Sequence, residues 1–172
     1  MKKRLLSAFM ALALCLTLLP TAALAAETNV AEVTAGSTTT QYADIVAAFD
    51  AAQKAESATV KLLKNVTIPQ NADSHSYGIC LKSGDITLDL NGCTIQTTGG
   101  ESGFVPLYAV FYIEDGSSLT VQDSGNGGKI VQPNGGQAIH VGSNGTLTVE
   151  SGAIEVTSND ESSSSYRSEE HT

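Results

Sequence analysis

Residues 79–97 read ICLKSGDITLDLNGCTIQT, and two later stretches repeat this pattern: residues 111–131 (FYIEDGSSLTVQDSGNGGKIV) and residues 139–157 (IHVGSNGTLTVESGAIEVT). Each stretch has a short run of alternating apolar residues, a glycine turn, a second run, another glycine turn and a third run. A repeat with three strand-sized pieces per unit predicts stacked coils, because each unit buries its apolar side against its neighbours.

Glycine turns separate the runs. The glycines that precede the middle runs, Gly84, Gly116 and Gly145, are 32 and 29 residues apart. Asn-Gly pairs occur at positions 91–92, 126–127, 134–135 and 144–145. Asn-Gly is also the strongest short signal for an antiparallel hairpin. However, each unit has three runs rather than two, so we expect bends between successive strands of one coil.

The middle runs predict the interior. Leu88, Val121 and Val149 occupy matching places in the three units, so we expect them to form one internal stack. Neighbouring coils should lie about 4.8 Å apart, the ordinary strand spacing.

The residues before the first clear repeat have a different period. Within residues 42–55, apolar residues recur at helical spacing at Tyr42, Ile45, Val46, Phe49 and Ala52. This spacing predicts an amphipathic helix of about three turns, placed to cap the open end of the stack. Residues 58–68 read as an irregular first coil. Residues 26–40 form a polar segment with a short strand before a turn at Gly36.

The first 25 residues predict an export signal. Three cations at positions 2–4 precede an apolar run at residues 5–19, and Ala23-Leu24-Ala25 forms a cleavage site. The run is short for a membrane span. We therefore expect a secreted or cell-surface protein with no membrane insertion after cleavage of residues 1–25; an uncleaved anchor is the alternative.

The last residues lack any apolar periodicity. A serine run precedes Tyr166, and residues 167–172 read RSEEHT, which resembles the translation of a sequencing-library adapter. We interpret residues 159–172 as a disordered or artefactual tail, and we expect the natural protein to continue beyond about Tyr166. An ordinary polar tail is the alternative.

The charge is strongly acidic. Removal of the three leader cations from the formal charge of −9 leaves about −12 on the mature chain. Such a surface repels phosphate backbones, which argues against nucleic-acid binding.

Two cysteines remain after the leader. Alternation turns Cys80 outward, between the inward Ile79 and Leu81, and turns Cys93 inward with Ile95. Side chains on opposite sides of a wall do not meet disulfide geometry. We therefore expect two free thiols, although an exported protein could form a bridge.

The blocks GDITLDLNGCTI (residues 84–95) and GSSLTVQDSGNGGKI (residues 116–130), preceded by YADIVAAFDAAQKAESATVKLLKNVTI (residues 42–68), carry a family resemblance. Over roughly residues 30–158 the chain resembles secreted bacterial surface proteins with right-handed parallel β-helix domains, the pectin-lyase-like architecture. The resemblance implies an all-β solenoid of three parallel sheets over residues 41–158, with an N-terminal capping α-helix. In the family's enzymes, polysaccharide commonly lies along one sheet beside variable loops.

One outward column is the candidate ligand face. It comprises Cys80, Tyr112, His140, Lys82 and Glu114. Loops expected to flank it lie at residues 69–77, 98–108 and 133–137. Tyr112 can stack on a sugar ring, and Tyr108 can assist from its loop. We therefore predict a polysaccharide or cell-surface glycan as the partner; ordinary exposed strand residues are the alternative.

The column does not offer the groups that catalysis requires in such a fold. Ca²⁺ takes six to eight oxygen ligands, and a glycoside hydrolase uses two carboxylates, whereas the column has only Glu114. Asp115 and Asp123, at turns, would make at most a weak Ca²⁺ site, so we expect no cofactor. His140 has no acid to orient it as a base. The carboxylates on the middle strands, such as Asp89, are expected to be solvated.

The sequence therefore favours a non-catalytic secreted or cell-surface scaffold for adhesion or carbohydrate binding. Two alternatives stay open. The chain could be the N-terminal part of a polysaccharide lyase or glycoside hydrolase whose catalytic coils lie downstream, or it could be a spacer with no ligand.

Overall fold

The computed structural model describes residues 28–69, 77–98, 108–133 and 135–157. This part of the chain is mostly β, with parallel sheets and one α-helix. The predicted leader at residues 1–25 and the tail at residues 159–172 lie outside it, as do residues 70–76, 99–107 and 134 of the expected loops. No helix within the described ranges is long and apolar enough to cross a membrane.

The chain begins with two strands and the helix: β1 (Ala31–Ala35), β2 (Thr38–Tyr42) and α3 (Ile45–Ala52). Two further strands precede the repeats, β3 (Ser57–Leu62) and β4 (Val66–Ile68). The first unit contains β5 (Tyr77–Leu81), β6 (Asp85–Asp89) and β7 (Thr94–Thr97). The second unit contains β8 (Ala109–Ile113), β9 (Ser118–Gln122) and β10 (Lys129–Gln132). The third unit contains β11 (Gln137–Val141), β12 (Thr146–Val149) and β13 (Ala153–Val156).

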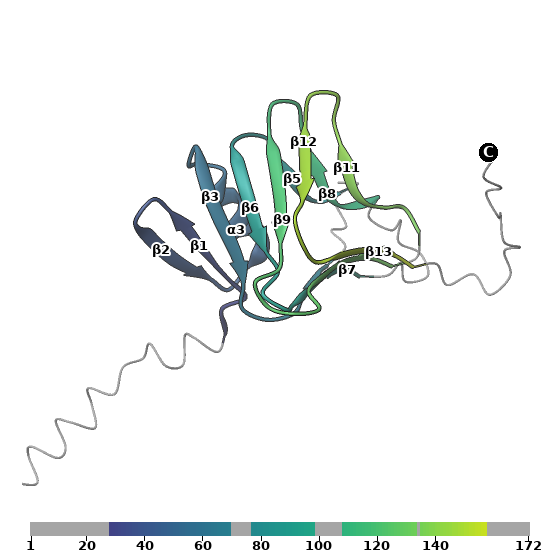
Figure 1. The fold of residues 1–172 in the computed structure, drawn as a ribbon, viewed down its shortest axis with the longest axis horizontal. Helices are drawn as coiled ribbons and strands as arrows, with labels where there is room; N and C mark the ends of the chain where they lie inside the picture. Colours follow the sequence, from purple (N-terminus) through teal and green to yellow (C-terminus); the bar gives the residue numbers. More distant parts are fainter. Residues whose placement is uncertain (1–27, 70–76, 99–107, 134, 158–172) are drawn as a thin grey trace, which may run out of the picture.

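Each unit contributes one strand to each of three sheets. The sheets have the strand orders β12-β9-β6-β3-β1-β2, β13-β10-β7-β4 and β11-β8-β5. Every pairing between units is parallel. Figure 1 shows the largest sheet from β2 to β12, with β5, β8 and β11 behind it and β7 and β13 below. The prediction of parallel pairing is confirmed, because none of the described strands on either side of an Asn-Gly turn pair as a hairpin.

The middle strands stack as expected. Leu88 pairs with Val121, and Val121 pairs with Val149, which confirms the predicted internal column. Leu88 and Val121 are fully buried, whereas Val149 is 46% exposed. The difference follows from position, because the described chain places no further strand on the free edge of β12.

The expected matching of the turn glycines Gly84, Gly116 and Gly145 is wrong by one residue in the second unit. Ser118 pairs with Asp85 and with Thr146, so Ser117 rather than Gly116 stands level with Gly84 and Gly145. Ser117 is buried, and its hydroxyl donates to the carbonyl oxygens of Leu81 and Glu114 at 2.9 and 2.7 Å. A side chain that satisfies two carbonyl groups thus takes the place expected for a glycine.

The predicted helix is present but shorter than residues 42–55. Asp44 caps α3, and its carboxylate accepts the N–H of Ala47 at 2.8 Å, which fixes the start of the helix. Ile45, Ala48, Phe49 and Ala52 are buried, while Val46 is exposed, so the apolar stripe includes Ala48 in place of Val46. Tyr42 belongs to β2. The ring of Phe49 meets that of Phe111 on β8 edge-to-face at 5.4 Å, which joins the helix to the core of the units.

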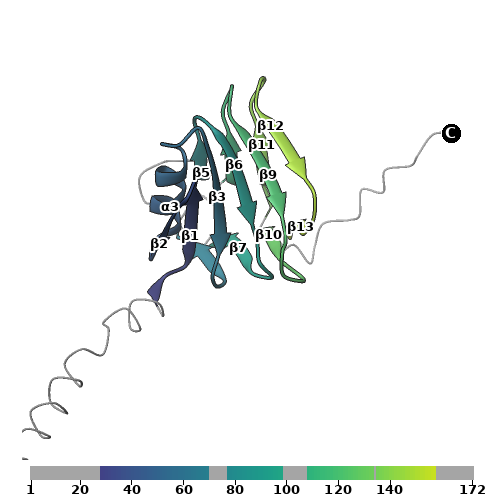
Figure 2. The ribbon, with the colours of Figure 1, turned by 60° about the vertical axis from the view of Figure 1, so that its left-hand side comes forward.

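The polar N-terminal segment is part of the fold, contrary to the boundary expected at residue 41. β1 and β2 form an antiparallel hairpin around Gly36, and β1 adds antiparallel to β3. Ala31 and Val33 of β1 are buried, whereas β2 is almost wholly exposed. Figure 2 shows this hairpin and α3 at one end of the molecule and β12 at the other.

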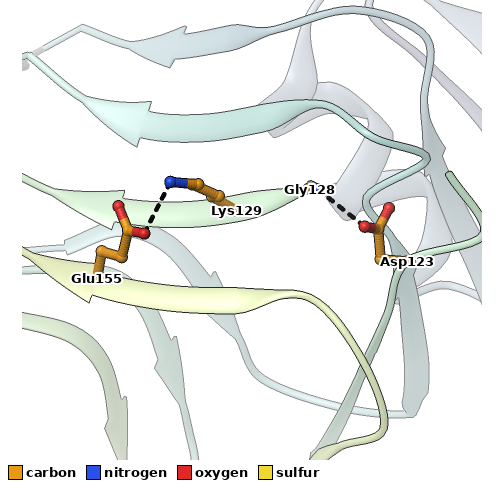
Figure 3. Close-up of polar contacts among 4 residues, drawn as sticks. All are labelled: Asp123, Gly128, Lys129 and Glu155. Atoms are coloured by element: carbon orange, nitrogen blue, oxygen red, sulfur yellow. Dashed lines mark hydrogen bonds and ion pairs between the residues drawn. The ribbon is translucent and has the colours of Figure 1, made fainter. Parts of the chain in front are cut away.

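The outer face of the four-stranded sheet carries one ion pair. Lys129 Nζ lies 2.8 Å from Glu155 Oε1, between β10 and β13 (Figure 3). Both side chains are about two-fifths exposed, at 42% and 41%, so solvent screens the pair and its contribution to stability is small.

Candidate functional site

The predicted column exists on the outer side of the three-stranded sheet. Cys80 pairs with Tyr112, and Tyr112 pairs with His140, so one outward residue from each unit stands in register. All three side chains are half-buried. The strands therefore bring together residues that are 32 and 28 positions apart in the sequence.

The rings at this column form a larger cluster than predicted. The ring of Tyr77 stacks on that of Tyr112 at 4.6 Å and 20°, and the ring of Tyr112 lies 5.1 Å from that of His140. Tyr108, 45% exposed, lies 6.0 Å from Tyr77 and 5.9 Å from His140 by ring centroids. We call Tyr77, Tyr108, Tyr112 and His140 the aromatic face.

Tyr77 is the residue that sequence reasoning missed. It was assigned to the end of a loop, yet it begins β5 and pairs with Ala109. Its ring reaches along the strand to the level of Tyr112. Alternation gave no signal for this residue, because Tyr77 occupies the same side of the strand as the inward Ile79 and Leu81. Only the structure shows that its ring joins Tyr112.

His140 is oriented by an amide rather than by an acid. Its Nδ1 lies 2.8 Å from Gln137 Oε1, on the same strand β11. If Nδ1 carries the proton and donates it to this oxygen, Nε2 remains an acceptor. A neutral hydrogen bond of this kind fixes the ring within the aromatic face.

Lys82 and Glu114 lie at the ends of their strands, beside the column. Lys82 is exposed, and its backbone N–H donates to Gln53 Oε1 at 2.7 Å; neither its ammonium nor the Glu114 carboxylate forms an ion pair within the described ranges. Burial, and then the nearby Glu114 carboxylate, raise the pKa of the Cys80 thiol, while Lys82 acts in the opposite direction. Burial, followed by Glu114 and Tyr77, likewise raises the pKa of Tyr112. Burial is thus the larger cause of both shifts, and Glu114 is the charged group that acts on both side chains.

The two thiols are free, as predicted. Cys80 and Cys93 are both half-buried, and Cys93 packs against the core. Burial is the main cause that raises the pKa of each thiol, so both stay protonated near neutral pH.

The carboxylates at the turns have structural partners. Asp89 is buried, not solvated as expected, because its Oδ1 accepts the N–H groups of Asn91 and Ser124 at 3.0 and 2.9 Å. Asp123 accepts N–H groups from Gly92 and Gly128, the latter at 2.8 Å in Figure 3. Asp115 accepts the backbone and side-chain N–H groups of Asn144. Among the described residues, no group of three or more His, Cys, Asp or Glu side chains is placed to hold a metal ion.

A hollow of about 750 Å³ adjoins the aromatic face. Its wall is shared by α3, β4 and β5, and its lining includes Val46, Asp50, Ile68, Tyr77 and Lys82. Tyr77 and Lys82 therefore border both the hollow and the face, which makes the two surfaces continuous.

Comparisons of the chain with models of protein families, with curated proteins and with solved structures found no match.

Proposed function

We propose that this chain forms coils of a right-handed parallel β-helix and serves as an exported, non-catalytic scaffold that binds a glycan on its aromatic face. The fold proposal rests on the three units, each of which supplies one strand to each parallel sheet in the same order. The export proposal rests on the leader pattern and the acidic mature chain.

The observation that carries the binding proposal is the gathering of four rings on one outer face. Tyr77, Tyr112 and His140 come from the successive strands β5, β8 and β11, and Tyr108 adds a largely exposed ring. Aromatic rings outside a core are costly to hydrate, and their flat faces pack well against the C–H face of a pyranose ring. A row of rings along successive strands suits an extended polymer better than a single small molecule.

The charged groups around the rings indicate which kind of polysaccharide the aromatic face would bind. Glu114 and Asp115 both act electrostatically on Tyr112, whereas Lys82 is the one cation in the column. Two carboxylates and one ammonium beside the rings, on a chain of formal net charge −9, disfavour uronate-rich polysaccharides and favour neutral or amino-sugar polymers.

The test is affinity electrophoresis of the purified protein on gels that contain neutral glucan, chitosan or polygalacturonate. We expect retardation on the first two, and Tyr112→Ala should weaken it by about 1 kcal/mol or more, because one stacking ring is lost outside the core. Thr120→Ala, a half-exposed outward position on β9, serves as the matched control and should migrate as the unaltered protein does.

Three outcomes contradict the proposal. Retention by no polysaccharide supports the spacer alternative. Equal retention of the Tyr112→Ala and unaltered proteins places binding elsewhere. Release of reducing or unsaturated ends, lost in Lys82→Ala or Glu114→Gln, supports the enzyme alternative.

A further inference from the structure

Asn-Gly pairs are prone to spontaneous deamidation, and the fold restrains the pairs of this chain to different degrees. The backbone nitrogen of the glycine attacks the side-chain carbonyl carbon of the asparagine, ammonia leaves, and a succinimide forms. Water then opens this ring to aspartate or isoaspartate, so one water is consumed and one ammonia released for a mass gain of about one dalton. The reaction is slowed by each hydrogen bond that holds the side-chain amide or the glycine nitrogen, and by a backbone that has no room to rotate.

The Asn91–Gly92 pair is held at both reacting groups. Asn91 Nδ2 donates to the Leu62 carbonyl at 2.9 Å, and the nitrogen of Gly92 donates to Asp123 Oδ1 at 2.6 Å. The turn also packs against residues 125 and 126 of the next unit. Both hydrogen bonds must break before the ring can close.

The Asn144–Gly145 pair is held in a similar way. Asn144 Nδ2 donates to Asp115 Oδ2 at 3.2 Å, and the nitrogen of Gly145 donates to the Gly142 carbonyl at 3.0 Å. A Cβ on Gly145 would meet the Ile113 carbonyl at 2.8 Å, so this backbone has little room to turn.

Asn126–Gly127 differs from both. The backbone N–H of Gly127 bonds to the Asp123 carboxylate, so the glycine nitrogen is engaged here too. The difference lies in the asparagine: both residues are exposed, and among the described residues no hydrogen bond engages the side-chain amide of Asn126. Gly127 has a φ of +83° and nothing within 4 Å of a Cβ built on it. We infer that, of the three Asn-Gly pairs whose two residues the structure describes, Asn126–Gly127 is the one that deamidates readily, while Asn91 and Asn144 are protected by the fold.

The modification has a structural consequence. Isoaspartate at position 126 lengthens the backbone of the turn between β9 and β10 by one carbon. In that turn the N–H of Gly128 is bound to Asp123 Oδ2, and the backbone of residue 126 approaches Gly92 of the neighbouring turn. Modified molecules should therefore lose protection of the Gly92 and Gly128 amides from hydrogen exchange.

The experiment is peptide mapping by mass spectrometry after incubation of the full chain at mildly alkaline pH, folded and in urea. In the folded protein Asn126 should convert at least about tenfold faster than Asn91 or Asn144, since each hydrogen bond to be broken costs on the order of a factor of ten. In urea the three rates should converge. Asn126→Gln, whose longer side chain closes a ring poorly, should remove the conversion at that position.

Asp115→Ala provides the matched test, because it releases the amide of Asn144 and leaves Asn126 untouched. Circular dichroism checks that this variant keeps the fold. In it, Asn144 should convert about tenfold faster than in the unaltered protein, because one hydrogen bond is lost while the Gly145 nitrogen stays bound to the Gly142 carbonyl. The rate at Asn126 should stay unchanged. Conversion of Asn91 or Asn144 as fast as Asn126 in the folded unaltered protein, or no acceleration at Asn144 in the variant, overturns the inference.

Discussion

Asp123 joins two turns that are far apart in the sequence. Its carboxylate accepts the N–H of Gly92, between the second and third strands of the first unit, and the N–H of Gly128 in the second unit. Charged acceptors form hydrogen bonds roughly twice as strong as neutral ones. The hydrogen bonds from Gly92 and Gly128 lower the pKa of Asp123 below its ordinary value of 3.8, although partial burial opposes them.

This lowered pKa predicts how acid affects stability. A carboxyl group with a lower pKa in the folded state stabilises the fold above its unfolded pKa, and this contribution is lost as the pH falls through the folded pKa. Asp123→Asn should lower the free energy of unfolding by about 1 kcal/mol at pH 7, after allowance for solvent screening. Urea titrations at pH 7 and pH 3 measure it: the gap between the two proteins should shrink at pH 3, and a constant gap would refute the linkage.

Among the elements, β9 shows how strand alternation separates core from surface. Val121 is fully buried in the column with Leu88, while Thr120 lies in the outward row with Thr87 and Thr148. Adjacent residues of one strand therefore have opposite environments.

Substitution at these two positions tests the alternation. Val121→Asp places an unpaired charge in the core and should cost several kcal/mol, on the order of 3–5. Thr120→Asp should change the free energy of unfolding by about 0.5 kcal/mol or less. Thermal unfolding of the two variants decides, and equal shifts in Tm would show that the inward and outward sides are wrongly assigned.

The end of α3 is fastened to the edge of β5 by Gln53. Its Nε2 donates to the Cys80 carbonyl at 3.2 Å, and its Oε1 accepts the N–H of Lys82 at 2.7 Å. The Gln53 side chain thus satisfies one carbonyl and one N–H at this strand edge, as a neighbouring strand would.

Removal of this amide should loosen the helix end. Gln53→Ala should cost about 1–2 kcal/mol, because the Cys80 carbonyl of β5 and the N–H of Lys82, just after the strand, lose their partner. Lys54→Ala, an exposed position next in the chain, is the control and should change little. Chemical denaturation measures both variants, and equal losses would argue against a role for the Gln53 amide.

At the scale of the whole molecule, the two ends of the sheets differ. One end is covered by the polar hairpin and by α3. At the other end, β11, β12 and β13 are the last strands of their sheets among the described residues, and their apolar side chains are exposed: Val141, Val149, Ile154 and Val156. Exposed apolar groups beside unpaired strand edges favour fraying and self-association.

Hydrogen exchange should follow this gradient. Amides of the third unit should exchange fastest, and those of β6 and β9, in the middle of the largest sheet, should exchange slowest. Mass spectrometry after peptic digestion resolves the units. Uniform protection from β5 through β13 would contradict the expectation, and sedimentation velocity at two concentrations would then show whether self-association covers the open edges.

What the sequence determined by itself is local. Alternation of side chains and the spacing of the turns predicted three strands per unit and the column of Leu88, Val121 and Val149. The resemblance to parallel β-helix proteins added the parallel pairing and, with alternation, the outward row of Tyr112 and His140. Each of these depends on residues a few positions apart, where the geometry of a strand decides which side a residue takes.

Only the tertiary structure decided what depends on contacts between units. The register places Ser117 level with Gly84, the ring of Tyr77 joins Tyr112, and Asp89 and Asp123 receive N–H groups from turns about 30 residues away. The polar strand β2 likewise gains its place only by pairing with β1. Such interactions are set by how the units stack and by which polar groups remain unsatisfied there, and no pattern within a single unit encodes them.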